Sequence, residues 1–275
     1  MLKLTNTFTK MSSIPVIGVP VVKNPVWVKR LIDSIDYPVD DVFIINNNGK
    51  GEIDQALDEL IHDGTNPFIK RLRVTHMPAN LGVPGSWNLI IKMFMKAPYW
   101  IISNDDVAFC PGFLKEMNET ALADPNAGLI HGYSGDFNVG NWDLFLIRDI
   151  IIQQFGLFDE NLYPAYNEDA DYFLRFIHRP IRKVMNLKTN YLHGTGSKNE
   201  YHVHGSQTSK SDPALKEKLD KVNLMNIDYM TKKWGPGWRL CKPSATPFEQ
   251  EGAGVFPIWY SPYDLEFVRS KHLGF

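Results

Sequence analysis

Two adjacent carboxylates, Asp105 and Asp106, follow an apolar run in the segment YWIISNDDVAF (residues 99–109). Neighbouring acidic groups in a partly dry site raise each other's pKa, so a cation or a hydrogen-bond network must stabilise them when both are ionised. A hard divalent cation with oxygen ligands would do this and would also neutralise a substrate diphosphate. Capping of a following helix, or simple solvation, is the structural alternative for this pair.

A second acidic cluster, Glu168, Asp169 and Asp171, lies in GLFDENLYPAYNEDADYFLRF (residues 156–176), beside apolar residues at helical spacing. The helix dipole favours acidic residues in a first turn, which explains their placement but not their number. A carboxylate at a helix start above a sheet is also a candidate general base for an incoming hydroxyl.

Three histidines follow in YLHGTGSKNEYHVHGS, namely His193, His202 and His204. They fit either a polar loop or a metal site in which one imidazole joins an aspartate. With an imidazole ligand, manganese becomes at least as plausible as magnesium.

Alternating strand and helix segments must position these groups. Apolar runs at residues 14–22, 41–46, 72–77 and 99–104 predict strands, and amphipathic or apolar segments at 25–35, 53–63 and 85–97 predict the helices between them. Such alternation requires crossover connections, so an α/β fold with a mostly parallel central sheet flanked by helices is expected. Ligands bind beyond the carboxyl ends of such strands. The loops PVVKN, NNNGKG, PANLGVPGSWN and NDDVAF are therefore the expected location of the site.

These loops lack the usual phosphate-binding fingerprints, because neither GxxxxGK[ST] nor GxGxxG occurs in them. A nucleotide would have to be bound by another arrangement. Asn46, Asn47 and Asn48 offer amide groups suited to a base or a ribose, although NNNG is also a common turn composition.

Composition narrows the class of protein. The chain has 275 residues, of which 44% are hydrophobic, and a formal net charge of −2, so it can bury a large core and is not expected to bind nucleic acid or an anionic membrane. Cys110 and Cys241 form no CxxC pair, which indicates a reducing compartment and no structural zinc. No apolar stretch approaches the roughly 20 residues that span a bilayer, and MLKLTNTFTKMSS lacks a signal-peptide core. A soluble, cytoplasmic protein is expected.

Several segments, in the same order, resemble glycosyltransferases of the GT-A fold, and in particular the inverting family 2 that uses nucleotide-diphospho-sugars. VIGVPVV resembles the nucleotide-binding start, and IINNNGKG stands where the family has an aspartate or asparagine followed by glycine. PANLGVPGSWN resembles its N.G…..N segment, and SNDDV occupies the position of its DXD motif. GLFDENLYPAYNEDADYFLR resembles its acceptor-side segment with an ED pair, and NIDYMTKKWG resembles a tail helix. The resemblance covers residues 14–235.

The resemblance implies roles for individual residues of the donor side. The base and the ribose would contact Pro20, Val21, Asn47 and Asn48. The nucleotide pocket would be shaped by Asn80, Gly82 and Asn88.

The same resemblance implies the residues of the reaction centre. Asn104, Asp105 and Asp106 stand in the DXD motif, with Asp106 as metal ligand and Asp105 nearer the ribose or donor sugar. Asn104 departs from the motif, because its amide carries no charge. His193 would help to hold the metal or the diphosphate. Asp169 would be the catalytic base, and Glu168 would orient the acceptor or donor sugar.

These roles imply a hexosyl- or deoxyhexosyltransferase with Mn²⁺ or Mg²⁺ as cofactor, a nucleotide-diphospho-sugar donor and a carbohydrate or glycoconjugate acceptor. Residues 1–205 are expected to form the catalytic core, with a donor half at 14–110 and an acceptor half at 111–205. Residues 206–275 are expected to add a helix and a wrapping tail to the same domain. Two alternatives remain: an inactive nucleotide- or carbohydrate-binding protein of the same fold, which Asn104 favours, and a sugar nucleotidyltransferase, which GVPVVKNP matches poorly.

Overall fold

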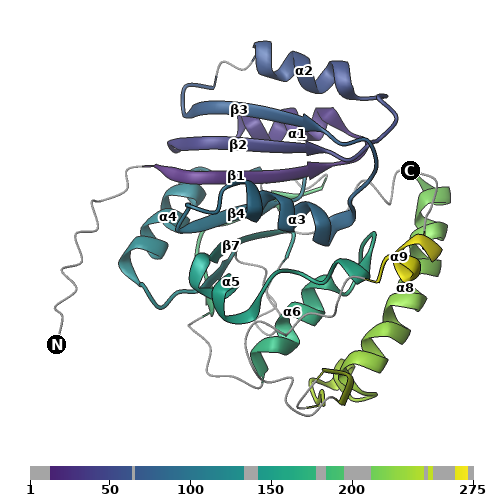
Figure 1. Cartoon of the computed structure of the whole chain (residues 1–275). Coiled ribbons are helices and arrows are strands. Elements are labelled where there is room, and N and C mark those ends of the chain that lie inside the picture. Colours follow the sequence, from purple (N-terminus) through teal and green to yellow (C-terminus); the bar gives the residue numbers. More distant parts are fainter. Residues whose placement is uncertain are drawn as a thin grey trace.

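The computed structural model describes residues 13–63, 66–132, 142–177, 184–194, 212–244, 247–249 and 264–271. Its centre is a seven-stranded sheet in the order β3-β2-β1-β4-β7-β6-β8 (Figure 1). The strands are β1 (Ile14–Val21), β2 (Val39–Asn46), β3 (Ile69–His76), β4 (Tyr99–Ser103), β6 (Leu129–His131), β7 (Leu144–Arg148) and β8 (Val184–Asn186). A separate two-stranded sheet pairs β5 (Val107–Phe109) with β9 (Tyr191–His193).

Most neighbouring strands of the large sheet run parallel, because helices return the chain to the same edge after each strand. The exception is β7, which is antiparallel to both β4 and β6. The expected α/β fold with a mostly parallel sheet is confirmed.

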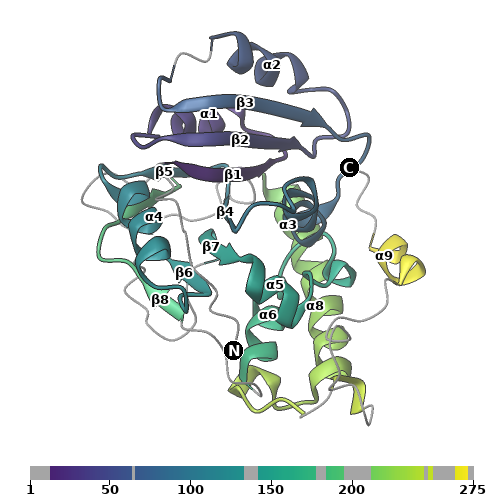
Figure 2. The same ribbon diagram turned by 60° about the vertical axis from the view of Figure 1, so that its left-hand side comes forward.

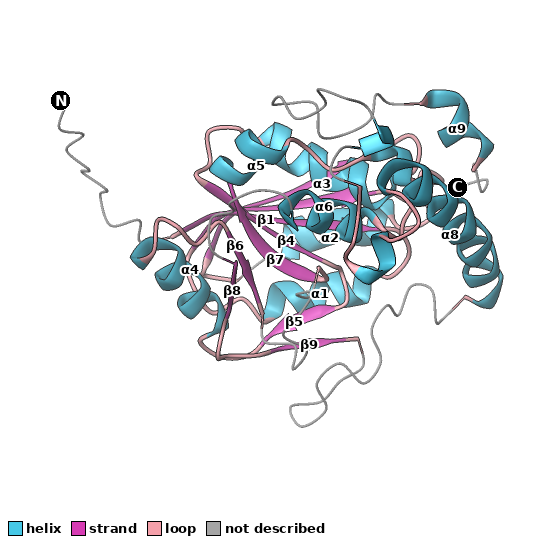
Figure 3. Ribbon diagram, turned by 90° about the horizontal axis from the view of Figure 1, so that it is seen from below, coloured by secondary structure: helices cyan, strands magenta, loops and turns pink. Residues whose placement is uncertain are grey.

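The helices flank the sheet on both faces (Figures 2 and 3). The α-helices are α1 (Pro25–Asp33), α2 (Asp54–Asp63), α3 (Gly82–Met93), α4 (Phe113–Ala123), α5 (Asp149–Phe155), α6 (Glu168–Ile177), α8 (Pro213–Trp234) and α9 (Leu265–Ser270), and the short 3₁₀ helices are η1 (Glu160–Leu162), η2 (Trp238–Leu240) and η3 (Pro247–Glu249). One core cluster packs α1, α2 and α4 against the sheet, and the second packs α3, α5 and α6 against its other face.

Successive side chains along a strand contribute in turn to the two core clusters on opposite faces of the sheet. In β4, Ile101 belongs to the first cluster while Trp100 and Ile102 belong to the second, because successive side chains of a strand point to opposite faces. Gly18 of β1 allows close packing of α3, since a Cβ at that position would lie 2.5 Å from the Ile90 side chain.

The helix α8 begins with a sequence-encoded cap. The side chain of Asp212 accepts a hydrogen bond from the backbone N–H of Leu215 (2.9 Å), and Pro213 occupies the first turn. One face of this helix is apolar and packs inward, because Leu215, Leu219, Val222 and Met230 are all buried. In both Figure 1 and Figure 2, α8 runs beside α6.

Over the described ranges, no helix has the length and apolar character needed to cross a bilayer.

Candidate active site

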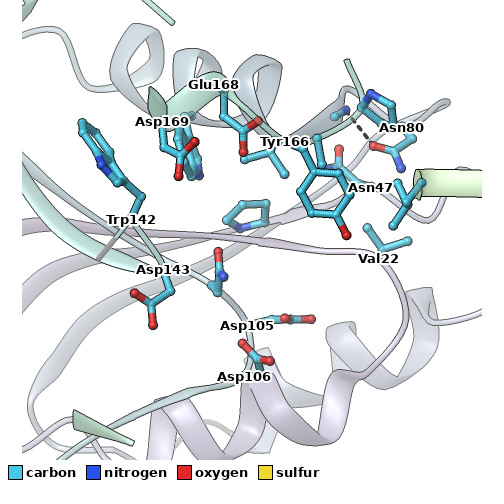
Figure 4. Close-up of a pocket in the computed structure, with 18 of the residues that line it drawn as sticks. Val22, Asn47, Asn80, Asp105, Asp106, Trp142, Asp143, Tyr166, Glu168 and Asp169 are labelled. Carbon is cyan, nitrogen blue, oxygen red and sulfur yellow. Dashed lines mark hydrogen bonds between the residues drawn. The ribbon is translucent and has the colours of Figure 1, made fainter. Parts of the chain in front are cut away.

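A cavity of about 310 Å³ opens beyond the carboxyl ends of β1, β2 and β4 and is covered by α6 and α8 (Figure 4). Most residues that the sequence singles out meet there. The predicted residues in its lining are Pro20, Asn47, Asn80, Gly82, Asn104, Asp105, Asp106, Glu168 and Asp169. The sheet therefore gathers residues from positions 20 to 169 at one edge, as expected for strands that end together.

The lining is strongly acidic. Among the described residues that line the cavity, Asp105, Asp106, Asp143, Glu168 and Asp169 carry carboxylates and none is Lys or Arg. Figure 4 shows the first three on one side of the cavity and the α6 pair on the other. A cation would offset the charge of these groups toward an anionic ligand such as a diphosphate.

Asp105 and Asp106 are both buried, with exposed fractions of 7% and 2%. Burial, followed by the charge of Asp106, raises the pKa of Asp105 to about 8. One oxygen of Asp105, Oδ2, makes no hydrogen bond to the described residues. The mutual repulsion expected from the sequence is therefore present, and the protein only partly offsets it.

Among the described residues, His193 supplies a positive charge beside this pair. The antiparallel pairing of β5 with β9 sets His193 opposite Val107. Its Nε2 lies 3.2 Å from Oδ1 of Asp106 and its Nδ1 lies 2.8 Å from Oδ2 of Asp143. Burial opposes the imidazolium, but the hydrogen bonds and charges of both aspartates raise the pKa of His193 to about 10. The structure thus brings His193 to Asp106, as predicted, whereas His202 and His204 lie outside the described residues.

The donor set suits a divalent cation that is shared with a substrate. Within the described ranges, no cluster of three or more His, Cys, Asp or Glu side chains is arranged to hold a metal ion. Magnesium and manganese do not require such a cage, because one or two carboxylates, waters and substrate phosphates commonly complete their coordination. The buried Oδ2 of Asp105, which has no hydrogen-bond partner among the described residues, is an oxygen donor of the kind that such a cation binds. The residues therefore fit the predicted Mn²⁺ or Mg²⁺.

The helix α6 presents the second acidic pair. Glu168 is 7% exposed, and its Oε2 has no hydrogen-bond partner among the described residues. Burial, together with the charge of Asp169, raises the pKa of Glu168 well above its usual value. Burial also raises the pKa of Asp169, whose Oδ1 accepts a hydrogen bond from the backbone N–H of Ala170 (2.7 Å). A carboxylate with a raised pKa is a stronger base for an acceptor hydroxyl.

The asparagines of the donor side divide into two groups. Asn47 and Asn80 line the cavity, and Asn47 also donates to Oγ of Ser86 (2.6 Å), which ties the end of β2 to α3. Asn48 instead accepts from the backbone N–H groups of Lys50 (3.1 Å) and Glu52 (3.2 Å), as a turn residue would.

Asn88 exchanges two hydrogen bonds of 2.9 Å with the backbone of Phe158, and these join α3 to the chain before η1. Val21, Asn48 and Asn88 are not among the residues that line the cavity. The geometry of the cavity therefore does not support the predicted nucleotide contacts of these three residues.

Sequence reasoning missed Asp143 and the aromatic residues of the cavity. The antiparallel direction of β7 brings the start of that strand to the end of β4, where the Asn104 N–H donates to the Asp143 carbonyl (2.8 Å). Trp142 and Trp87 also line the cavity, with nearly parallel rings whose centroids lie 6.4 Å apart. The signal that could have revealed Asp143 is an acidic residue directly before the apolar run LFLI.

The α/β fold is the one expected for a glycosyltransferase of the GT-A fold. Residues 17–162 match the family model Glycosyl transferase family 2, which is more than half of the chain, and the protein belongs to this family. The expected resemblance to this family is confirmed.

Two of the proteins that are similar to this chain illustrate the relationship. A galactofuranosyl glycosyltransferase from Leishmania donovani is 23% identical to this chain over an alignment of 294 positions. The alignment covers 81% of this chain and 67% of that protein. The mannosyltransferase PcManGT from Pyrobaculum calidifontis, in complex with GDP-Man and Mn²⁺, has a TM-score of 0.53 at 13% identity over 69% of this chain. The alignment spans 58% of that structure, less than two thirds of its length, and it shows the common fold.

Proposed function

We propose that this protein transfers a sugar from a nucleotide-diphospho-sugar to an acceptor hydroxyl, with Mn²⁺ or Mg²⁺ bound at Asp106 with the help of His193, and with Asp105 nearer the ribose or donor sugar. The observation that carries the proposal is the cavity lining, in which five carboxylates face one another without a Lys or Arg among the described lining residues. A diphosphate is the kind of group that would bring a cation into such a site. Membership of glycosyl transferase family 2 supports the donor class, whereas it gives no support to a sugar nucleotidyltransferase.

In the proposed reaction, Asp169 removes the proton of the acceptor hydroxyl. The hydroxyl oxygen then forms a bond to the anomeric carbon of the donor, while the bond from that carbon to the diphosphate oxygen breaks. Attack opposite to the departing group inverts the configuration at that carbon. A bound cation would supply charge neutralisation for the leaving diphosphate. Glu168, which faces the same cavity, would hold sugar hydroxyls through its carboxylate.

The cavity also suggests where each part of the substrate binds. The base and ribose would lie toward Pro20, Asn47 and Asn80, and the sugars toward Trp142 and the α6 acids. Aromatic rings pack well against the apolar faces of sugars, and the carboxylates would repel acidic ones. Neutral hexosyl or deoxyhexosyl groups are therefore the proposed cargo.

Calorimetric titration of the protein with UDP, GDP and dTDP, in Mn²⁺ or in EDTA, tests the proposal. We expect one of these nucleotides to bind with Mn²⁺ and to lose measurable binding in EDTA. The variant Asp106→Asn should weaken binding in Mn²⁺. Asp33→Asn on α1, whose side chain is 59% exposed, is the matched control and should not change it. Equal affinity with and without the cation would refute the metal-dependent mode.

Hydrolysis or transfer of the matching nucleotide sugar separates an enzyme from a binding protein. Release of nucleoside diphosphate in Mn²⁺ supports the transferase. Binding without any turnover would favour the inactive binding protein, for which the uncharged Asn104 in the DXD position is the specific observation.

A further inference from the structure

The chain immediately before the α6 acids has an unusual backbone. Tyr166 and Asn167 are consecutive residues with positive φ angles of 78° and 73°. Side chains other than glycine disfavour this region, because the Cβ approaches a backbone carbonyl oxygen. Such conformations persist where surrounding structure holds them, and they cluster at functional sites. Here they directly precede Glu168 and Asp169, so they set the direction in which α6 starts.

One asparagine of α8, Asn226, donates hydrogen bonds to backbone carbonyl groups of this turn. The Nδ2 of Asn226 lies 2.9 Å from the carbonyl oxygen of Ala165, 3.1 Å from that of Tyr166 and 3.2 Å from that of Leu162. Asn226 is completely buried. Lys271, at the end of α9, donates to Oδ1 of Asn226 (2.9 Å), so the amide is oriented with its nitrogen toward the three carbonyls.

A second asparagine, Asn223, binds the same turn through a side chain. The Nδ2 of Asn167 donates to Oδ1 of Asn223 (2.9 Å). Asn223 and Asn226 are three positions apart on a helix and therefore share a face. The same helix contributes Leu215 and Leu219 to the lining of the cavity. Thus α8 contacts both the cavity and the turn that aims the acids.

We infer that Asn223 and Asn226 are positioning residues of the active site, which hold the left-handed turn at Tyr166 and Asn167 so that Glu168 and Asp169 face the cavity. Without their hydrogen bonds, the turn would relax toward negative φ and rotate the first turn of α6. The family match ends at residue 162, so it includes neither α6 nor α8. The inference rests on the proposed function, because it takes Asp169 as the base.

The test compares turnover with nucleotide affinity in the full chain. The probe is whichever of UDP-glucose, UDP-galactose, dTDP-rhamnose and GDP-mannose the wild type hydrolyses fastest in Mn²⁺. We expect Asn226→Ala to lower kcat for hydrolysis by up to about 100-fold, the size of effect that a misplacement of about 1 Å produces. The Kd of the matching nucleoside diphosphate, measured calorimetrically, should stay close to that of the wild type. Leu224→Ala on the same helix is the control, since Leu224 is 67% exposed, and should change neither quantity.

A rescue variant distinguishes positioning from general stabilisation. Glycine adopts positive φ readily, so Tyr166→Gly, which leaves the hydrogen bond from Asn167 to Asn223 in place, should restore part of kcat in the Asn226→Ala background. A merely structural role would lower the melting temperature of Asn226→Ala and leave kcat per folded molecule unchanged, and that result would overturn the inference. So would a double variant whose kcat is no higher than that of Asn226→Ala.

Three further outcomes are informative. If Asn226→Ala does not fold, Asn223→Ala takes its place, and an unchanged kcat in that variant refutes the inference. A wild type that binds no nucleotide in Mn²⁺ refutes the proposed function, and the inference falls with it. A wild type that hydrolyses the donor while the asparagine variants keep its kcat refutes the inference alone.

Discussion

Replacing Lys233 should destabilise the protein strongly, because this lysine belongs to a buried charge cluster between α6 and α8. Asp159, Asp171, Arg175 and Lys233 are each at most 1% exposed. The Nζ of Lys233 lies 2.6 Å from Oδ2 of Asp159 and 2.7 Å from Oδ1 of Asp171. Arg175 donates from Nε to Oδ2 of Asp171 (3.1 Å). The two positive and two negative groups balance.

The change Lys233→Met keeps the length of the side chain and leaves one carboxylate uncompensated. Burial opposes ionisation of Asp171, but the charges of Arg175 and Lys233 hold its pKa below the usual value. Removal of one member of a buried ion pair costs about 3–5 kcal/mol. The free energy of unfolding of a typical protein is about 5–15 kcal/mol in total. The variant should therefore lose a large part of its stability.

Urea denaturation followed by circular dichroism measures this loss. With a slope of about 2–3 kcal/mol per molar urea, the midpoint should fall by about 1–2 M. The control is Lys232→Met, which changes the neighbouring lysine, whose side chain is 69% exposed. Its unfolding free energy should stay within about 0.5 kcal/mol of the wild type.

A second variant tests the electrostatic cause. Adding Asp159→Asn to Lys233→Met removes the stranded negative charge, so the double variant should be less destabilised than the two single effects added together, with a coupling of about 0.5–3 kcal/mol. Equal midpoints for Lys233→Met and Lys232→Met would refute the reasoning, because the buried cluster would then contribute no more than an exposed ion pair.

Three further predictions concern the active site. Asp169→Asn should lower donor hydrolysis by about 100- to 10,000-fold, the usual contribution of a positioned base, with unchanged nucleotide affinity in calorimetry; retained hydrolysis would remove Asp169 from the mechanism. Because burial raises the pKa of Asp169 above its ordinary value of 3.8, kcat/KM should fall as the pH drops through that raised pKa, and a pH profile with its acidic limb at or below 3.8 would contradict this. Gly82→Ala should lower the unfolding free energy by about 1–3 kcal/mol, measured in thermal melts. The reason is that Gly82 has a φ of 71° and that a Cβ there would lie 2.8 Å from the Pro164 carbonyl oxygen. An unchanged unfolding free energy would contradict this prediction.

The sequence predicts the parallel part of the sheet well for a physical reason. The runs that form β1, β2 and β4 are buried on both faces, so they are almost continuously apolar and easily recognised. The strands β6 and β8 have three residues each, too few to show a period. The helix α3 starts at Gly82, three residues before the predicted start.

The candidate site could be predicted only where its chemistry is local. Asp105 and Asp106 stand out because they are adjacent, and Asp169 because it starts an amphipathic helix. The acidic residue before LFLI marks Asp143 only as the neighbour of a strand, since its place in the cavity depends on the antiparallel pairing of β7 with β4. The role of Asn226 depends on the packing of α8 against a turn 60 residues earlier, which no local pattern encodes.

The absence of Lys and Arg from the described cavity lining has a consequence for the end of the proposed reaction cycle. When the sugar has been transferred, a nucleoside diphosphate in this cavity would face the carboxylates, with a bound cation and the His193 imidazolium as the positive charges beside it. Loss of the cation would leave less positive charge to offset that repulsion and would favour departure of the product. Turnover would then respond to the free concentration of the ion at release as well as at binding.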